Sequence, residues 1–514
     1  MKKPKAKQDT SPTSSGFLIN SNQISVLFWL ASSYFIFLGL HSLGTYDEST
    51  VLGYFLILGA SALPIFLWIQ GANHGLPIYP LFCSSIFTTF GAPLITQHPW
   101  IIAFQPEAHL SVAVTTATAL SVGTALWFLT TKNQPALPTR CRQLPLVGGE
   151  RILLGCLLAF SIFALNNLFN FLPLKGGTFS LIQGVVLGLN NLAVFMLSQR
   201  LGSGKLTKWN TILFLTLFAF QSIVTTASIL LYSTFAVTIL ALAGFTIGAR
   251  RIPWLATAAA IMIAGFLHIG KTEMRVKYWD EAKNINIVSV ADIGPFYLDW
   301  FAMSWDEMFR PRSAVDDDEK GVSLFQRSSL IQLMLYMKDI NDRGYPHLNG
   351  ETYSLIPRLL VPRILNPDKP WSLEGNTLLT THYGLQTRED TLITTIGFGM
   401  FNEGYGNYGV LGVILVGGVM GLCFGLLGRF TTGYPTLSFR TLLAILGLSV
   451  AFQTEFTAGV LVTTLFQGLV ALVAFSFVFM KNLPVLEEAP LLAPLRKKRD
   501  VPKIKNLHRE TPSP

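Results

Sequence analysis

Residues 408–428 read YGVLGVILVGGVMGLCFGLLG and contain no charged side chain. A run of this length matches the roughly 20 apolar residues that a helix needs to cross a bilayer. Because lipid offers the backbone no hydrogen-bonding partner, such a run must be helical. The glycines Gly417, Gly421 and Gly425 recur at four-residue spacing and predict a face on which a second helix packs closely. This stretch therefore predicts a membrane-spanning helix.

Runs of the same kind recur along the chain. Half of the 514 residues are hydrophobic and 13% are charged, against about 25% charged in an average soluble domain. We therefore predict an all-α polytopic membrane protein with about 12 transmembrane helices. The predicted spans are 24–44, 51–69, 77–96, 108–130, 152–171, 179–198, 209–231, 233–248, 254–270, 408–428, 438–454 and 458–480.

The Lys and Arg residues indicate how these spans are oriented. Short cytoplasmic segments are enriched in positive charge. With the N-terminus inside, the cytoplasmic segments hold 23 of the 38 basic residues, whereas the short outer loops hold only Lys175. Both termini are therefore predicted to be cytoplasmic. Since the basic residues serve orientation, the net charge of +9 does not indicate nucleic-acid binding.

This topology divides the chain into five parts. They are a cytoplasmic tail (1–23), helices 1–9 (24–270), a large external loop (271–407), helices 10–12 (408–480) and a basic cytoplasmic tail (481–514). Many twelve-helix transporters consist of two similar halves, often joined by a central cytoplasmic loop. Here the halves are not similar and the large loop is external, which counts against that class.

No pattern in the sequence indicates a metal ion or a cofactor. The four cysteines form no CxxC pair, and most lie in or beside apolar spans as small apolar residues. No HExxH pair is present. The acidic run 316–319 is typical of a solvated loop, with divalent-cation binding as the alternative. We therefore expect neither a metal nor a cofactor.

The external loop is too long to be a simple connection. Apolar residues recur at roughly helical spacing over residues 323–340. This pattern predicts an amphipathic helix that either lies on the membrane surface or packs on the mouth of the bundle.

The same loop is dense in cations that topology does not require. Either they keep the loop soluble, or they bind a polyanionic ligand at the membrane face. The segments IPRLLVPR (356–363) and NPDKPW (366–371) carry three of them, and their prolines fix φ and stiffen the chain. Because the arginine fork matches two phosphate oxygens at once, we favour phosphate binding. The cations are Lys271, Arg275, Lys277, Arg327, Arg358, Arg363, Lys369 and Arg388.

A glycine- and aromatic-rich segment, GFGMFNEGYGNYG (397–409), directly precedes the tenth span. Glycine allows the backbone to turn tightly or to approach a ligand closely. The single carboxylate of this segment, Glu403, is expected near the outer interface. Two roles remain as alternatives for Glu403: a salt bridge to a loop arginine, or catalysis.

In their order along the chain, these motifs resemble the Wzy-type oligosaccharide repeat-unit polymerases of bacterial O-antigen and exopolysaccharide pathways. The many-span topology with a late external loop extends the resemblance over the chain. The motifs are Lys271 and Arg275, Arg327, GETY (350–353), IPR (356–358), DKP (368–370) and EGYGNYGVLG (403–412).

The resemblance implies a lipid-linked glycosyltransferase, GT-C-like and multi-pass, in the bacterial inner (plasma) membrane. It would polymerise undecaprenyl-diphosphate-linked repeat units on the periplasmic face, with a lipid-linked chain as donor and a single lipid-linked repeat as acceptor. Its expected partners are these two glycans, membrane lipids, a chain-length regulator and a flippase. Nucleic acid is not among them.

The resemblance also implies roles for individual residues. Arg358 and Arg363 would stabilise the departing diphosphate by roughly 3–4 kcal/mol, if each well-placed donor acts as one in an oxyanion hole does. Glu403 is the first choice for the general base that accepts the proton of the attacking hydroxyl. Asp368 and His382 are the reserves. Diphosphate or substrate binding is expected of Lys271, Arg275, Arg327, Lys369 and Tyr353.

Two other functions stay open. A glycan ligase, which transfers a finished chain from lipid diphosphate to another acceptor, would share the topology and the arginines. A polysaccharide transporter or flippase would carry charges deep within its spans. Most charges of this chain lie outside the spans or at their ends.

Overall fold

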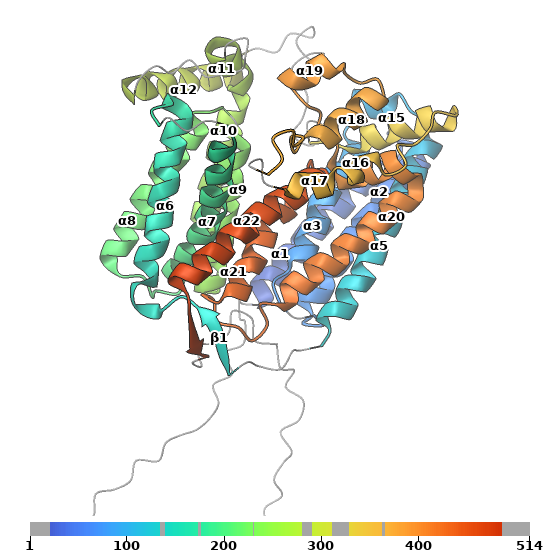
Figure 1. Ribbon diagram of the computed structural model, residues 1–514. Helices are drawn as coiled ribbons and strands as arrows, with labels where there is room; N and C mark the ends of the chain where they lie inside the picture. The colour runs from blue at the N-terminus through green and yellow to red at the C-terminus, as the bar shows by residue number, and fades with distance from the viewer. Residues whose placement is uncertain are drawn as a thin grey trace, which may run out of the picture.

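A computed structural model gives the structure of the chain (Figure 1). Helices predominate among the described residues, and two short strands, β1 (Arg140–Gln143) and β2 (Lys481–Pro484), pair antiparallel. The described residues are 21–73, 75–133, 139–172, 176–229, 231–279, 290–310, 328–361 and 365–485.

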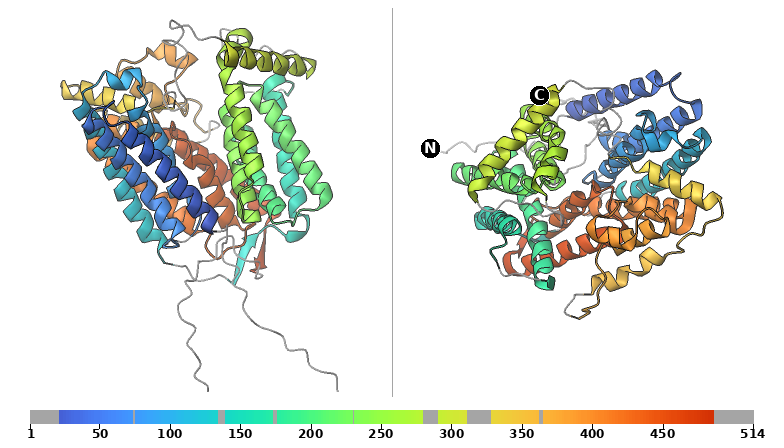
Figure 2. Two further views of the ribbon diagram at one scale, coloured as in Figure 1. Left: turned by 180° about the vertical axis from the view of Figure 1, so that it is seen from behind. Right: turned by 90° about the horizontal axis from the view of Figure 1, so that it is seen from above.

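The long helices form a bundle of two groups, which lie side by side when seen from above (Figure 2). The first group consists of α1 (Ser21–His41), α2 (Glu48–Ile69), α3 (Ile78–Ile86), α5 (Pro106–Thr131) and α20 (Gly399–Arg429). The second consists of α6 (Leu146–Phe169), α7 (Gly176–Gly202), α8 (Lys208–Thr226), α9 (Leu231–Ala249) and α10 (Trp254–Ile269). Two further helices connect the groups, α21 (Phe439–Ala451) through α3 and α7, and α22 (Ala458–Phe479) through α20 and α7.

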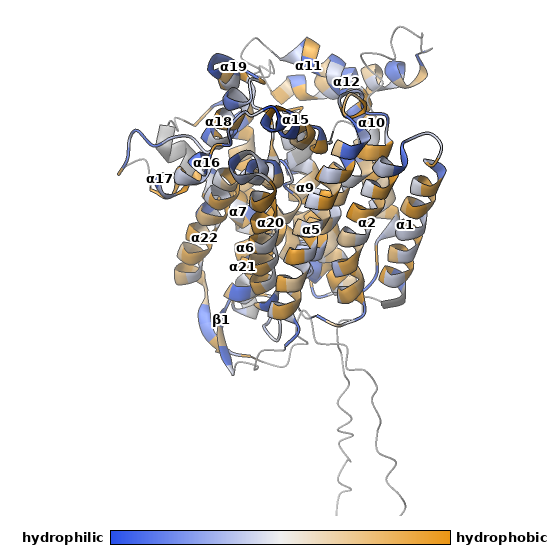
Figure 3. Cartoon of the chain, turned by 90° about the vertical axis from the view of Figure 1, so that its right-hand side faces the viewer, coloured by the Kyte–Doolittle hydropathy of each residue, from blue (hydrophilic) through white to orange (hydrophobic). Residues whose placement is uncertain are grey.

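The outward faces of the bundle are apolar. Large side chains such as Leu255, Met262 and Leu411 are exposed. Figure 3 shows hydrophobic residues along the helices, with hydrophilic residues concentrated at the two ends of the bundle. A continuous apolar surface of this kind requires lipid rather than water around it. The chain is therefore a multi-pass membrane protein.

Most of the predicted spans coincide with long helices. Within the described chain, nine helices are long and apolar enough to cross a membrane, and α10 with α11 (Lys271–Tyr278), bent by 52°, makes a possible tenth. The predicted spans 233–248 and 438–454 fall on the shorter apolar helices α9 and α21. The predicted all-α polytopic fold class is confirmed, whereas the number of 12 spans stays a prediction.

The small-residue face of α20 packs on α5. A Cβ atom on Gly417 would lie 2.3 Å from the backbone oxygen of Ala119, and one on Gly421 would lie 2.0 Å from that of Gly123. Only glycine allows the two backbones to come this close. The packing role predicted for these glycines is confirmed.

Short helices cover one end of the bundle, which we call the loop end. The strands β1 and β2 lie at the opposite end, which we call the strand end (Figure 1). At the loop end, α3 continues as a π-helical turn, η1 (Phe87–Gly91), and a 3-10 turn, η2 (Ala92–Ile95). The remaining elements are α4 (Pro99–Ile102), α11, η3 (Val290–Asp292), α12 (Ile293–Phe309), α15 (Ile331–Asp342), α16 (Glu351–Ser354), α17 (Ile356–Leu360), α18 (Glu374–His382) and α19 (Arg388–Ile393).

Helix α15 corresponds to the amphipathic helix predicted over 323–340. It begins at Ile331, and residues 323–327 and the acidic run 316–319 lie outside the described residues. Most of its apolar residues are buried, Met334 and Leu335 completely, and the helix contacts α5 and α20. Of the two predicted locations, packing on the bundle is the one observed.

Candidate active site at the loop end

Three buried polar residues organise the loop end. Asn402, Glu403 and Asn407, which we call the polar hub, are 0–1% exposed although they belong to the first three turns of an apolar helix, α20. The helix is kinked just after them, because Tyr408 and Gly409 have non-helical dihedral angles. Gly409 has a φ of 60°, a conformation that glycine adopts without steric cost. The hub therefore forms a separate segment above the membrane-spanning part of α20.

The two asparagines attach loop segments to this helix. The side-chain amide of Asn402 donates to the backbone oxygen of Leu330, 2.9 Å away, at the start of α15. The amide of Asn407 donates to the hydroxyl of Thr352 in α16 at 2.8 Å, and its oxygen accepts from the backbone N–H of Gly350 at 3.0 Å. Two distant parts of the loop layer are thus fixed to the same short helical segment.

Glu403 attaches a third segment. Its Oε2 atom accepts a hydrogen bond of 2.5 Å from the backbone N–H of Ala458, the first residue of α22. Burial disfavours the charged form of this carboxyl, and the N-terminus of α22, with its unpaired N–H groups and partial positive charge, opposes that effect. The other oxygen, Oε1, is buried without a hydrogen-bond partner. None of the ion pairs between described residues involves Glu403, so the predicted salt bridge to a loop arginine is not observed there.

The segment that carries the predicted phosphate-binding residues lies directly beside the start of α22. We call residues 358–371 the cationic loop; residues 362–364, including Arg363, lie outside the described residues. Both ends of the loop meet at Gly459 of α22. A Cβ atom there would lie 3.0 Å from the Leu359 side chain and 3.5 Å from the backbone oxygen of Ser372. Within the loop, Arg358 and Asp368 are exposed and Lys369 is partly buried.

Tyr353 lies between the polar hub and the cationic loop. Its hydroxyl is buried without a hydrogen-bond partner, and its ring stacks on that of Tyr408 with 6.2 Å between the centroids. Burial raises the pKa of Tyr353, and the nearby charges of Glu403 and Tyr408 raise it further. The structure therefore brings Tyr353 and Glu403 together, as the predicted shared site requires.

Two more of the predicted cations lie on α11, which begins at the bend after α10. Desolvation raises the pKa of the Glu455 carboxyl, and the positive charge of Lys271 partly offsets this rise. Glu455 adjoins the hub, since its backbone oxygen accepts from the N–H of Gly399 at 3.1 Å. Arg275 stacks on the ring of Trp279, 4.3 Å from its centroid. Lys271 thus acts on a carboxyl that adjoins the first residue of α20.

Of the last two predicted residues, Arg327 lies outside the described residues, and His382 is not part of this arrangement. His382 is at the C-terminal end of α18, where its Nε2 atom is 2.8 Å from the backbone oxygen of Pro346 and its ring packs beside Tyr345. With Nε2–H donating to this oxygen, Nδ1 would be the unprotonated nitrogen.

Sequence reasoning missed the asparagines of the hub and their partners. Asn402 and Asn407 stand one residue before and four after Glu403, in the segment whose glycines and carboxylate carry the predictions above. Polar side chains in a helix that enters a membrane need partners, which was the available signal. Thr352, the partner of Asn407, and Ala458, the partner of Glu403, are each 55 residues away, in opposite directions along the chain, and nothing local identifies them.

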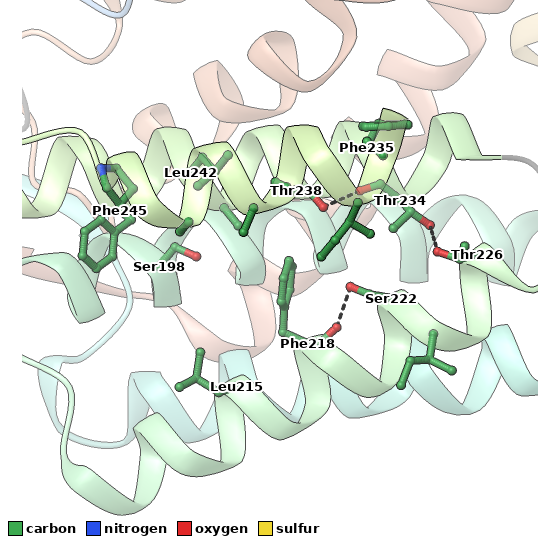
Figure 4. Close-up of a pocket in the computed structure, with 18 of the residues that line it drawn as sticks. Ser198, Leu215, Phe218, Ser222, Thr226, Thr234, Phe235, Thr238, Leu242 and Phe245 are labelled. Carbon is green, nitrogen blue, oxygen red and sulfur yellow. Dashed lines mark hydrogen bonds between the residues drawn. The ribbon is translucent and has the colours of Figure 1, made fainter. Parts of the chain in front are cut away.

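An apolar cavity of about 780 Å³ lies in the second helix group (Figure 4). Phe218 of α8, Leu242 and Phe245 of α9 and Leu267 of α10 line it, together with Tyr297 of α12 at the loop end. Among the described residues, no group of three or more His, Cys, Asp or Glu side chains is arranged to hold a metal ion.

Comparison of the chain with protein-family models, with curated proteins and with solved structures finds no match.

Proposed function

We propose that this protein is a lipid-linked glycosyltransferase that polymerises diphosphate-linked oligosaccharide repeats at the loop end of its helix bundle. The observation that carries the proposal is the attachment of the cationic loop to the start of α22, beside the polar hub. Cations on a fixed backbone segment next to a membrane surface suit a ligand whose diphosphate lies at the end of a lipid chain. The loop end then faces the periplasm, and both termini face the cytoplasm.

The proposed reaction needs no cofactor. An oxygen of the acceptor sugar forms a bond to the anomeric carbon of the donor. The bond from that carbon to the lipid diphosphate breaks, and its electron pair goes to the diphosphate. Arg358, together with Lys369, Arg363, Lys271, Arg275 and Arg327, stabilises the negative charge that develops there.

The proton of the attacking hydroxyl must go to a base. Asp368 has an exposed carboxylate within the cationic loop and can reach a bound sugar. Glu403 is 1% exposed and already accepts the N–H of Ala458. We therefore give the base role to Asp368 and treat Glu403 as a positioning residue, with Tyr353 above it. His382 remains the second reserve.

The apolar cavity supports a lipid-linked substrate. Its volume lies within the range of about 300–1,000 Å³ that is typical of small-molecule sites, and its walls are suited to an isoprenoid or acyl chain. No soluble donor would need such a cavity.

The glycan profile of a strain that lacks this protein tests the proposal. We expect single repeats on the surface, because repeats are still made and exported but not joined. Loss of all surface glycan would instead favour the ligase that transfers finished chains. Accumulation of repeats on the cytoplasmic face would favour a flippase.

A further inference from the structure

A second cavity, of about 360 Å³, lies in the loop-end half of the bundle. The last turns of α8 and α21, the first turn of α9 and the middle of α7 and α22 enclose it. The C-terminal end of α8 and the N-terminal end of α9 are at the loop end, since the hydroxyl of Tyr297 in α12 donates to the backbone oxygen of Ile223 in α8. The cavity therefore lies within the membrane-spanning bundle and near the loop layer.

The lining of this cavity is uncharged and combines apolar side chains with many polar ones. None of the described lining residues is Asp, Glu, Lys, Arg or His, while seven are serine or threonine. Two phenylalanines, Phe160 and Phe456, add apolar surface. Five side-chain amides complete the wall, those of Gln183, Asn191, Gln221, Gln453 and Gln467.

Two of the amides lack partners. Gln221 is 2% exposed, and its Oε1 atom makes no hydrogen bond within the described chain. The Oδ1 atom of Asn191 is also buried and unpaired. An unpaired buried acceptor is unfavourable, and more so within a membrane, unless a ligand or water supplies a donor. These two oxygens point to a ligand that carries hydroxyl or N–H donors.

The lining also limits the charge of the ligand. A diphosphate or a free ion would lose its hydration here without meeting an opposite charge, which is strongly unfavourable. A sugar ring is neutral, carries several hydroxyl donors and acceptors and presents apolar C–H faces, so it matches amides, hydroxyls and phenyl rings together. The volume falls at the lower end of the range of small-molecule sites, about 300–1,000 Å³.

The position of the cavity relates it to the two other features of the proposed site. Ser372, which directly follows the cationic loop and contacts Gly459, is one of its lining residues. Ser222 and Thr234 line both this cavity and the apolar one. A neutral sugar pocket thus adjoins the proposed diphosphate-binding loop on one side and the apolar cavity on another.

We propose that this cavity, which we call the amide cavity, is a binding subsite for neutral sugar residues of the glycan. As a step in glycan polymerisation the proposal rests on the proposed function. As a sugar-binding site it can be tested separately.

The test uses the full-length protein in lipid nanodiscs and three probes: methyl α-glucoside, methyl β-galactoside and the methyl glycoside of N-acetylglucosamine. Binding is measured by saturation-transfer NMR. We expect at least one glycoside to bind, and Gln221→Met and Asn191→Leu each to weaken it about tenfold, because each removes a buried hydrogen bond to the ligand. The matched control is Asn190→Leu, since Asn190 precedes Asn191 in α7, is fully buried and does not line the cavity.

A second measurement uses the unmodified protein and so does not depend on whether the variants fold. A diazirine derivative of the bound glycoside, photolysed with the unmodified protein, should label peptides from α7, α8, α21 and α22. Three results would overturn the proposal. They are labelling confined to other parts of the chain, absence of binding by all three glycosides, and binding of the glycoside to the Gln221→Met variant as tightly as to the original protein. If the deletion strain still polymerises its glycan while these results hold, only the proposed function fails; if polymerisation is lost and the glycosides do not bind, only the sugar subsite fails.

Discussion

At the scale of single residues, Glu403 shows how a carboxylate near a membrane can serve structure. One of its oxygens completes the N-terminus of α22, and the side chain is almost fully buried. The same residue is the only carboxylate in the glycine-rich segment, which is why the sequence suggests a base. Because a general base has to reach the hydroxyl that it deprotonates, the burial of Glu403 favours the structural role over that of a base.

Substitution of Glu403 tests this assignment. Glu403→Ala leaves the N–H of Ala458 without its partner and should lower the free energy of unfolding by about 1–3 kcal/mol. Glu403→Gln keeps an oxygen acceptor, so it should retain most of the stability and continue to make polymer. The measurements are thermal unfolding of the purified protein and the length of the glycan in complemented cells. Loss of polymer in a stable Glu403→Gln variant would return the base role to Glu403.

The residues of the site were only partly predictable. Glu403 and the cations follow from residue type and from their place beside apolar runs. The contact of Glu403 with Ala458 and that of Asn407 with Thr352 each join residues 55 positions apart, and single-sequence patterns do not encode such pairs. The role of a buried polar residue is thus evident only when its partner is known.

At the scale of elements, the α5–α20 contact depends on glycine. Gly421→Ala places a Cβ atom 2.0 Å from the backbone oxygen of Gly123. The backbone must move to relieve this clash. We expect it to lower stability by about 1–3 kcal/mol, as overpacking does, and to lower the midpoint of thermal unfolding in detergent. The control is Gly59→Ala in α2, where nothing lies within 4 Å of the new atom. Helix propensity favours alanine there by about 1 kcal/mol, so this change should be neutral or stabilising. Equal effects of the two substitutions would contradict the close contact.

Three helices of the second group are joined by a buried ion pair at the strand end. Arg200 of α7 lies 2.6 Å from the carboxylate of Glu150 in α6, which also accepts a 2.6 Å hydrogen bond from Asn210 of α8. Arg200→Met leaves the buried carboxylate without its counter-charge and should cost about 3–5 kcal/mol.

The double variant Glu150→Gln/Arg200→Met removes the unpaired charge and should recover much of that loss. Chemical or thermal unfolding in detergent measures both variants. A single variant as stable as the original protein would show that the pair contributes little.

The elements themselves were predicted well where hydropathy alone decides them. The spans follow from long apolar runs, since lipid forces such runs into helices. The start of α20 was placed at residue 408, whereas the helix begins at Gly399. Its first turns contain Asn402, Glu403 and Asn407, which look like loop residues in the sequence because their loop partners are not visible there.

At the scale of the whole molecule, the bundle has two chemically different ends. The loop end carries the polar hub and the cationic loop, and the strand end carries β1 and β2 (Figure 1). The distribution of Lys and Arg predicts that the strand end is cytoplasmic. The pairing of β1 with β2 places the connection before α6 and the end of α22 on the same side, in agreement with that orientation.

Reporter fusions test the orientation. Alkaline phosphatase inserted at Gly344, which follows α15 in open space, should be active because that enzyme matures only in the periplasm. Green fluorescent protein fused to the C-terminus should fluoresce, as expected for a cytoplasmic end. The reverse pattern would place the loop end inside the cell and exclude a periplasmic reaction.

The central claim is that the cationic loop binds the diphosphate of a lipid-linked glycan, and Arg358→Ala tests it most directly. The measurement is the length distribution of the surface glycan in a deletion strain that expresses the variant at the normal level. Loss of one well-placed donor should slow the reaction by about 10²–10³-fold, so we expect single repeats in place of polymer. The matched control is Arg343→Ala, because Arg343 is exposed at the end of α15 and pairs only with Asp339 among the described ion pairs; it should leave the polymer unchanged. Polymer of normal length from Arg358→Ala would contradict the account.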